Sequence, residues 1–122
     1  MNDGVAGWWA KAQSSMDKAA RLLKWKWHED AIFYAQQAAE RGLKALLLQR
    51  EDTIIKTHDL PFLAKRVGAP ATILTLCKEL SPVYMESRYP TTAHEWREYT
   101  REEAESDLRR AQEILLWIKK NL

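Results

Sequence analysis

The segment from about Glu29 to Gln49 constrains the fold more than any other part of the chain. Its apolar residues recur at three- and four-residue spacing, which is the period of an α-helix. They form two stripes, a small one of Ala31, Ala35, Ala38, Gly42 and Ala45 and a bulky one of Ile32, Ala39, Leu43, Leu46 and Leu47. A helix that is apolar on more than one side is surrounded by other elements. We therefore expect this helix at the centre of a helical bundle.

Four further helices are expected from apolar periodicity and from residues that begin or end helices. They span about Val5–Trp25, Leu60–Val67, Ala71–Ser87 and, beginning after Thr100, a last helix to Lys120. Asp59 precedes the third helix as an N-cap, and Thr100 with Glu103 has the spacing of a capping box. Pro82 lies inside the fourth helix and predicts a kink or a break near Glu79–Ser81.

The composition fits a single soluble globular domain. The chain has 122 residues, of which 46% are hydrophobic and 30% charged. Only four glycines and four prolines are present, which argues against an all-β fold with its many turns. We expect an all-α, up-and-down bundle of four to five helices, three of them long, formed by one domain over residues 1–122.

Charge and cysteine content indicate the cellular compartment of the protein and the kind of ligand site to expect. The single cysteine, Cys77, excludes an internal disulfide and suits a reducing compartment. No apolar run approaches the length of a membrane span, and the N-terminus lacks the pattern of a signal peptide, so we expect a cytoplasmic protein without membrane contact. The net charge of +2 does not by itself predict nucleic-acid binding, so a phosphate site has to be local. Arginines alternate with glutamates along the last helix, which indicates a solvated face with ion pairs rather than an RNA track.

The polar stretch Ser87–Tyr99 interrupts the helical pattern and holds the main candidate site. It reads S-R-Y-P-T-T-A-H-E-W-R-E-Y and places Arg88 and His94 six positions apart. An imidazole that titrates near neutral pH can act as a general base or acid, and a guanidinium can hold a phosphate. The same residues can also form an ordinary polar turn, in which Arg88 pairs with a carboxylate and His94 faces solvent. The residues alone leave both interpretations open.

Other polar and aromatic residues are weaker candidates. His58 in T-H-D-L can contact phosphate if the loops converge, although a histidine just before a helix more often satisfies local backbone groups. A metal site is not expected, because His28, His58 and His94 lie far apart and Cys77 has no companion at metal-binding spacing. Most of the six tryptophans are expected in the core or a dimer interface, with Trp96 in the polar stretch as the exception.

Motifs along nearly the whole chain form one ordered pattern. The first motif is an early tryptophan in the first predicted helix, with spaced alanines in the same helix. The remaining motifs are Ala35-Gln36-Gln37-Ala38-Ala39-Glu40 followed by Leu43-Lys44-Ala45-Leu46-Leu47, Thr57-His58-Asp59-Leu60 with Leu63, Arg88-Tyr89-Pro90, and a closing Ala104…Ala111-Gln112-Glu113-Ile114…Trp117-Ile118. Each motif is weak alone, but their order and spacing together are specific, and in this order they resemble the HEPN domain family (higher eukaryotes and prokaryotes nucleotide-binding).

The resemblance implies a helical bundle that usually dimerises, and often a small nucleotidyltransferase as partner in a toxin–antitoxin-like pair. Many such proteins are metal-independent endoribonucleases with an arginine, four to six residues and then a histidine, a pattern that Arg88 and His94 fit. We therefore expect a homodimer that binds RNA or a nucleotide and needs no cofactor and no metal. Arg88 and His94 would be catalytic, and Arg88, Tyr89, His58 and Trp96 would bind RNA or nucleotide.

The chain departs from the family's ribonuclease pattern in two ways. Tyr89 follows Arg88 where a small polar residue is common, and Pro90 keeps this part extended. The tyrosine that partner transferases modify in some such toxins is replaced by Trp96, so Tyr89 or Tyr99 would have to take its place. These departures favour an alternative, a non-catalytic nucleotide-binding or adaptor subunit that docks a nucleotidyltransferase. A third interpretation is an interaction subunit whose small-residue stripe serves only assembly.

Overall fold

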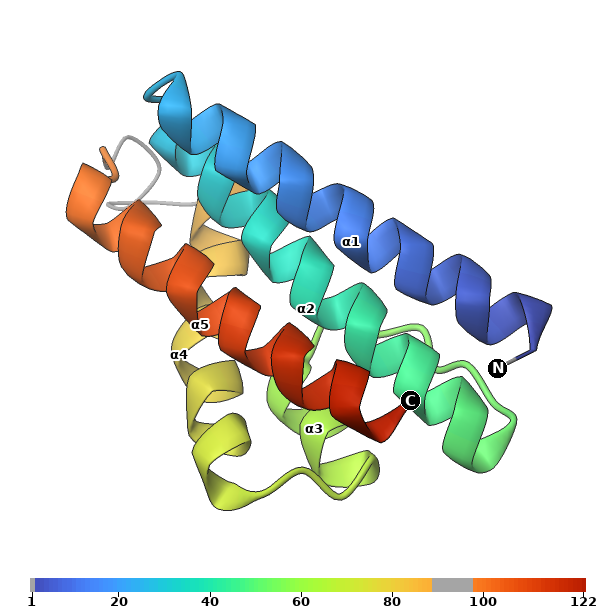
Figure 1. Cartoon of the computed structure of the whole chain (residues 1–122). Coiled ribbons are helices and arrows are strands. Elements are labelled where there is room, and N and C mark those ends of the chain that lie inside the picture. The colour runs from blue at the N-terminus through green and yellow to red at the C-terminus, as the bar shows by residue number, and fades with distance from the viewer. Residues whose placement is uncertain (1, 89–97) are drawn as a thin grey trace.

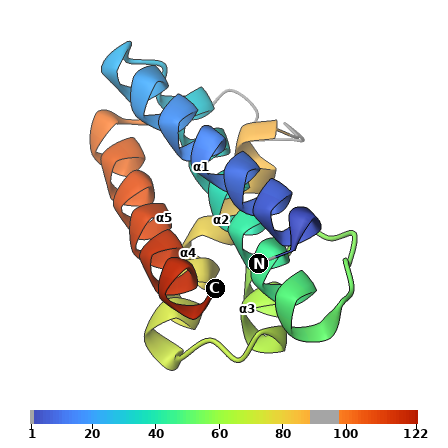
Figure 2. The same ribbon diagram turned by 45° about the vertical axis from the view of Figure 1, so that its right-hand side comes forward.

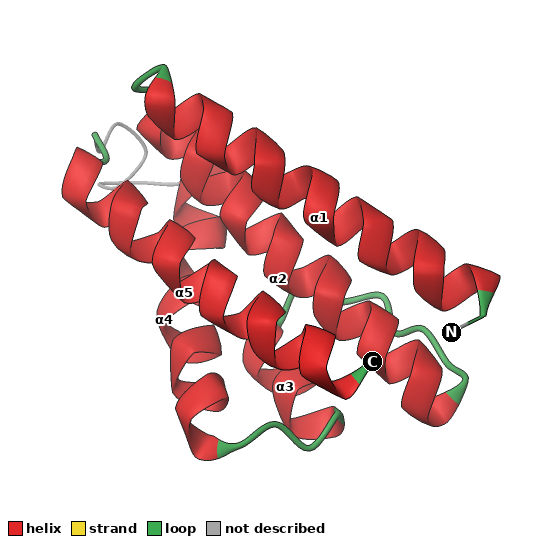
Figure 3. Ribbon diagram, viewed as in Figure 1, coloured by secondary structure: helices red, strands yellow, loops and turns green. Residues whose placement is uncertain are grey.

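The protein folds as a bundle of five helices, and the computed structural model describes residues 2–88 and 98–122 (Figure 1). The helices are α1 (Asp3–Lys24), α2 (His28–Glu51), α3 (Leu60–Arg66), α4 (Ala71–Arg88) and α5 (Arg101–Asn121). Figure 3 shows helices joined by loops and no strand in the described part of the chain. The all-α prediction is therefore confirmed, and α1, α2 and α5 are the long helices.

Helix α2 occupies the centre, because it packs against α1, α3, α4 and α5. Every residue of the small and the bulky stripe is buried. A Cβ atom added at Gly42 would lie 2.8 Å from Leu115 Cδ2 and 3.0 Å from Ile118 Cδ1, both on α5. The small residues therefore let α5 approach α2 within one chain. The interpretation that this stripe serves only assembly between chains is wrong.

Side-chain caps define where the helices begin. Asp59 Oδ1 accepts a hydrogen bond from the backbone N–H of Phe62 at 3.1 Å, as expected for the N-cap of α3. The capping box at α5 is also confirmed: Glu103 N donates to Thr100 Oγ1 at 3.1 Å, and Thr100 N donates to Glu103 Oε1 at 3.3 Å. These caps fix the start of α5 just after the candidate polar stretch.

Helix α4 differs from the prediction because it runs without a break from Ala71 to Arg88. The prediction near Glu79–Ser81 was a kink or a break; the break is wrong, and the kink stays a prediction. A proline inside a helix removes one i→i−4 hydrogen bond, and the remaining bonds can carry the helix past it. The longer helix brings Arg88, the first residue of the candidate motif, to the end of α4.

The turn between α1 and α2 has a lysine where a glycine is usual. Lys26 has a φ angle of 66°, in the left-handed region. Its N–H donates to Leu23 O at 3.0 Å, and the N–H of Trp27 donates to Leu22 O at 2.9 Å. This pair of hydrogen bonds is the Schellman motif, whose left-handed position is normally glycine. The motif ends α1 sharply, and α2 begins at His28.

The described tryptophans lie mostly outside the core, and their location in a dimer interface, the other half of the expectation, stays a prediction. Trp8, Trp9 and Trp117 are half-buried. Trp25 and Trp27 are 60% and 58% exposed, so they lie on the surface of the bundle. Trp96 lies outside the described residues. Among the described helices, none is long and apolar enough to cross a membrane.

Candidate functional site

The Arg88–His94 motif belongs to the connection between α4 and α5. Arg88 is the last residue of α4, and Arg101 is the first residue of α5. Tyr89, His94 and Trp96 lie outside the described residues. The structure therefore describes the two helix ends that bound the motif, and the contact between Arg88 and His94 stays a prediction.

Tyr99 anchors the last part of this connection. Its side chain is buried and packs with Ile32 and Ala104, while Leu23 packs against the same small cluster. His28 Nδ1 lies 3.1 Å from Tyr99 O, which joins the start of α2 to the start of α5. Burial makes Tyr99 a poor acceptor for modification by a partner enzyme.

The α1–α2 turn lies at the same end of the bundle as the start of α5 (Figure 2). A basic pocket lies beside this turn. Its volume is about 640 Å³, and it is lined by Ala20, Leu23, Lys24, Lys26, His28, Arg101 and Glu105. Arg101 Nε pairs with Glu105 Oε1 at 2.7 Å, so these two charges largely cancel. Neither Lys24 nor Lys26 forms an ion pair with another described residue, and the pocket is therefore net positive.

Helices α4 and α5 are joined by an ion-pair cluster centred on Arg110. Arg110 Nη1 donates to Asp107 Oδ1 at 2.6 Å, and Arg110 Nε pairs with Glu79 Oε2 on α4. Asp107 is buried, and burial raises its pKa, while Arg110 acts on the Asp107 pKa in the opposite direction. The cluster holds α4, which ends at Arg88, against α5. Its role is therefore to position the two helices that carry the candidate motif.

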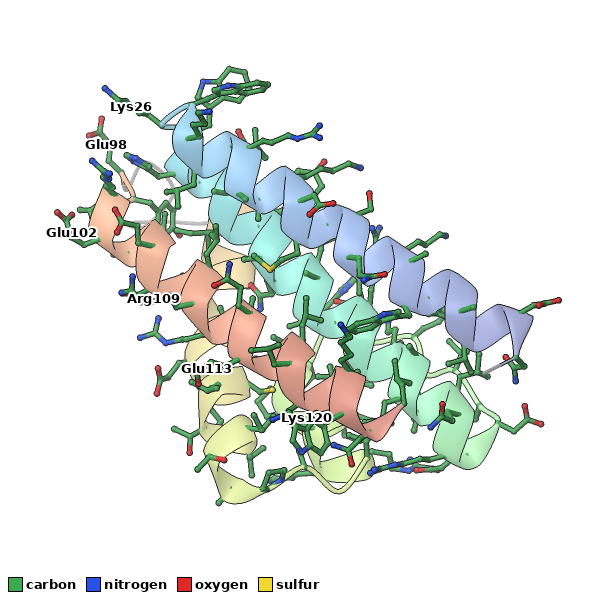
Figure 4. All side chains as sticks on the ribbon, viewed as in Figure 1. Lys26, Glu98, Glu102, Arg109, Glu113 and Lys120 are labelled. Atoms are coloured by element: carbon green, nitrogen blue, oxygen red, sulfur yellow. The ribbon has the colours of Figure 1, made fainter. Side chains whose placement is uncertain are left out.

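The ion pairs predicted along the last helix are also present. Glu105 lies between Arg101 and Arg109, with Arg109 Nη1 at 4.0 Å from Glu105 Oε2. Figure 4 shows the labelled side chains of Glu102, Arg109 and Glu113 on the outer side of α5. The described part of this face is thus solvated and salt-bridged, as its sequence pattern indicated.

His58 lies in the loop before α3 and contacts α2. Its Nδ1 is 2.8 Å from Glu40 Oε1, although 53% of the His58 side chain is exposed. Glu40 also accepts a hydrogen bond from Lys44 Nζ at 3.0 Å, and Lys44 lies 5.7 Å from the centre of the Trp8 ring. These contacts give His58 a structural role in joining the loop to α2. Its contact with RNA or nucleotide stays a prediction.

Sequence reasoning missed the exposed basic and aromatic side chains of the α1–α2 turn. The signal is the run W-K-W-H over residues 25–28, where the first two predicted helices meet. No group of three or more His, Cys, Asp or Glu side chains in the described ranges could hold a metal ion.

Four helices around a buried α2, with an arginine–histidine motif between the last two helices of the chain, define a small helical-bundle domain. The model of the HEPN domain family matches residues 5–122. TT1696 from Thermus thermophilus has a similar crystal structure, with a TM-score of 0.89 and 31% identity over 99% of this chain and 100% of that chain. ST0689, an archaeal HEPN homologue, has a TM-score of 0.78 and 30% identity over 95% of each chain. The comparison with curated proteins finds no match. The chain belongs to the HEPN domain family.

Proposed function

We propose that the protein acts on RNA as a metal-independent endoribonuclease of the HEPN family. The observation that carries the proposal is the spacing Arg88-x5-His94 in a chain that belongs to this family. The position of Arg88 at the end of α4, held against α5 by the Arg110 cluster, supports it. The net positive pocket at the start of α5 adds an environment suited to phosphate.

The two motif residues divide the chemistry of RNA cleavage between them. His94 takes the proton of the ribose 2′-hydroxyl, or gives a proton to the leaving 5′-oxygen. The 2′-oxygen attacks the phosphorus as the bond to the 5′-oxygen breaks, so the products are a 2′,3′-cyclic phosphate and a 5′-hydroxyl. Arg88 holds the phosphate and stabilises the charge that develops on its oxygens.

The proposal includes partners that the family resemblance suggests. The protein works in the cytoplasm as a homodimer, in which the two Ser87–Tyr99 stretches face one cleft. A small nucleotidyltransferase binds it as the second member of a toxin–antitoxin-like pair. A gene for such an enzyme beside this one would support the pairing.

The test is cleavage of single-stranded RNA in the presence of a chelator by the purified protein and its variants. We expect the wild type to cleave and His94→Ala and Arg88→Ala to lose cleavage while keeping the wild-type circular dichroism spectrum. Arg109→Ala is the matched control for Arg88→Ala, because Arg109 is exposed and makes a long ion pair on α5. Cleavage by His94→Ala at the wild-type rate would refute the ribonuclease mechanism.

A second candidate function is a non-catalytic subunit that binds a nucleotide or docks the nucleotidyltransferase. The departure Tyr89-Pro90 after Arg88 favours it, because an extended segment at this point alters the usual motif. Calorimetry with ATP, GTP and short RNA distinguishes the two functions. Tight nucleotide binding without RNA cleavage would support the non-catalytic subunit.

A further inference from the structure

We propose that the α1–α2 turn binds single-stranded RNA outside the Arg88–His94 motif. Trp25 and Trp27 stack on bases, and Lys24 and Lys26 contact the phosphates that follow. This inference rests on the proposed function in one respect, namely that RNA is the ligand of the protein. It assigns a binding surface to residues that the cleavage chemistry does not use.

The first argument is the exposure of two large aromatic side chains at one turn. Trp25 and Trp27 are 60% and 58% exposed, and their ring centres lie 6.4 Å apart at an interplanar angle of 70°. Both rings therefore keep most of their surface free. Because every base has a π-face, exposed aromatic rings next to cations form a stacking platform for single strands of any sequence.

The second argument is the charge around these rings. Lys24 and Lys26 flank Trp25 in the chain and line the pocket beside the turn. The pocket's carboxylate, Glu105, is already paired with Arg101. The lysines are thus the uncompensated charges of the pocket. Alternating aromatic and basic side chains suit a ligand with apolar rings and a charged backbone better than they suit an apolar partner surface.

The third argument is the backbone at Lys26. A glycine would adopt the left-handed conformation of this position at lower cost than any residue with a Cβ atom. The chain nevertheless has a lysine there, and its side chain projects from the end of the bundle (Figure 4). A conformational cost at an exposed position is consistent with a role for the side chain in binding.

The fourth argument is the position of the turn relative to the motif. His28 Nδ1 contacts the backbone of Tyr99, which is the residue before Thr100 and α5. Figures 1 and 2 show the α1–α2 turn at the end of the bundle where α4 ends and α5 begins. A single strand that stacks on Trp25 and Trp27 therefore lies at the end of the bundle where α4 ends at Arg88.

The experiment measures binding of a short labelled oligouridylate by fluorescence anisotropy in the His94→Ala protein, which prevents cleavage during the measurement. We expect Trp25→Ala with Trp27→Ala to weaken binding about tenfold or more, because one stacked base contributes about that much. Leu116→Ala is the matched control, since Leu116 is an equally exposed apolar residue on α5. The control variant should bind as its parent does.

Charge is tested with one pair of variants. Lys26→Glu should weaken binding and reduce the slope of log affinity against log salt by about one or more. Lys120→Glu is its control, because it makes the same charge change near the C-terminal end of α5, whereas the pocket lies at the start of α5 (Figure 4). Equal effects of the two variants would overturn the inference, since only bulk charge would then matter.

The outcomes separate this inference from the proposed ribonuclease. If RNA is bound through Trp25 and Trp27 but never cleaved by the wild type, the binding surface stands and the ribonuclease mechanism fails. If His94 is required for cleavage but the double tryptophan variant keeps its RNA affinity, the binding surface is refuted. A changed oligomeric state with unchanged RNA affinity would also refute it and would assign the turn to a protein interface.

Discussion

The conformational cost of the left-handed backbone at Lys26 can be measured as a difference in the free energy of unfolding. A residue with a Cβ atom in this region costs about 1–2 kcal/mol, and a glycine loses about 0.5–1 kcal/mol more backbone entropy on folding. Lys26→Gly should therefore raise the free energy of unfolding by about 0.5 kcal/mol. Urea denaturation of wild type and variant checks this. A less stable variant would mean that the Lys26 side chain makes stabilising contacts that outweigh its backbone cost.

The buried thiol of Cys77 should be unreactive in the folded protein. Burial on α4 raises the pKa of Cys77 to about 12, so the nucleophilic thiolate is absent near neutral pH. Labelling with a thiol reagent at about pH 8 should be slow in buffer and fast in urea, where the usual thiol pKa returns. Rapid labelling of the folded protein would show that this part of α4 opens readily.

The same thiol gives a pH dependence of stability in the alkaline range. The unfolded chain loses the Cys77 proton near its ordinary pKa of 9.0, whereas the folded chain keeps it up to about 12. The unfolded state therefore binds fewer protons in this window, and the free energy of unfolding falls as the pH rises above about 9. Cys77→Ala should show a smaller fall, measured by urea denaturation at several pH values.

Arg110 should contribute more to stability than its neighbour Arg109. Arg110→Ala leaves Asp107 buried without its 2.6 Å partner and removes the link to Glu79 on α4. We expect a loss of about 2 kcal/mol, because a buried acceptor without its partner carries its desolvation cost. Arg109→Ala should cost at most about 0.5 kcal/mol, since exposed ion pairs contribute little. If thermal denaturation showed similar losses of stability in Arg110→Ala and Arg109→Ala, this prediction would be contradicted.

At the scale of helices, the contact between α2 and α5 depends on the absence of a side chain at Gly42. Gly42→Leu should destabilise the protein by about 3 kcal/mol, because the new side chain would overlap Leu115 and Ile118. Gly7→Leu is the matched control, since a Cβ atom at Gly7 meets nothing within 4 Å. Helix propensity favours leucine over glycine, so the control should be at least as stable as wild type. Equal free energies of unfolding for the two variants would show that close packing of α5 on α2 does not depend on Gly42.

Helix ends show where sequence reasoning succeeds and where it fails. Thr100 with Glu103 was predictable because a capping box depends on local hydrogen bonds between residues three apart. The continuation of α4 past Pro82 was not predictable, because a proline's effect on a helix depends on the packing around it. The left-handed backbone conformation of Lys26 was also missed, since the sequence has no glycine at or beside this position to indicate it.

For the whole molecule, the central place of α2 followed from its two apolar stripes, because burial of several faces requires neighbours on several sides. The candidate site was predictable only in part. The spacing of Arg88 and His94 is visible in the sequence, and the motifs along the chain led to the family that the comparisons show. The basic pocket was not visible, because it joins Lys24 and Lys26 to Arg101, more than seventy residues away.

The central position of α2 predicts that the bundle unfolds as one unit. Each of α1, α3, α4 and α5 packs against α2, so loss of any one of them exposes part of the α2 surface. Far-UV circular dichroism and tryptophan fluorescence should therefore report the same urea midpoint, although Trp8 and Trp117 lie on different helices. Gly42→Leu should move both midpoints together. A fluorescence transition that precedes the loss of helix would show instead that α1 or α5 separates first, and that α2 with its remaining neighbours forms the stable core.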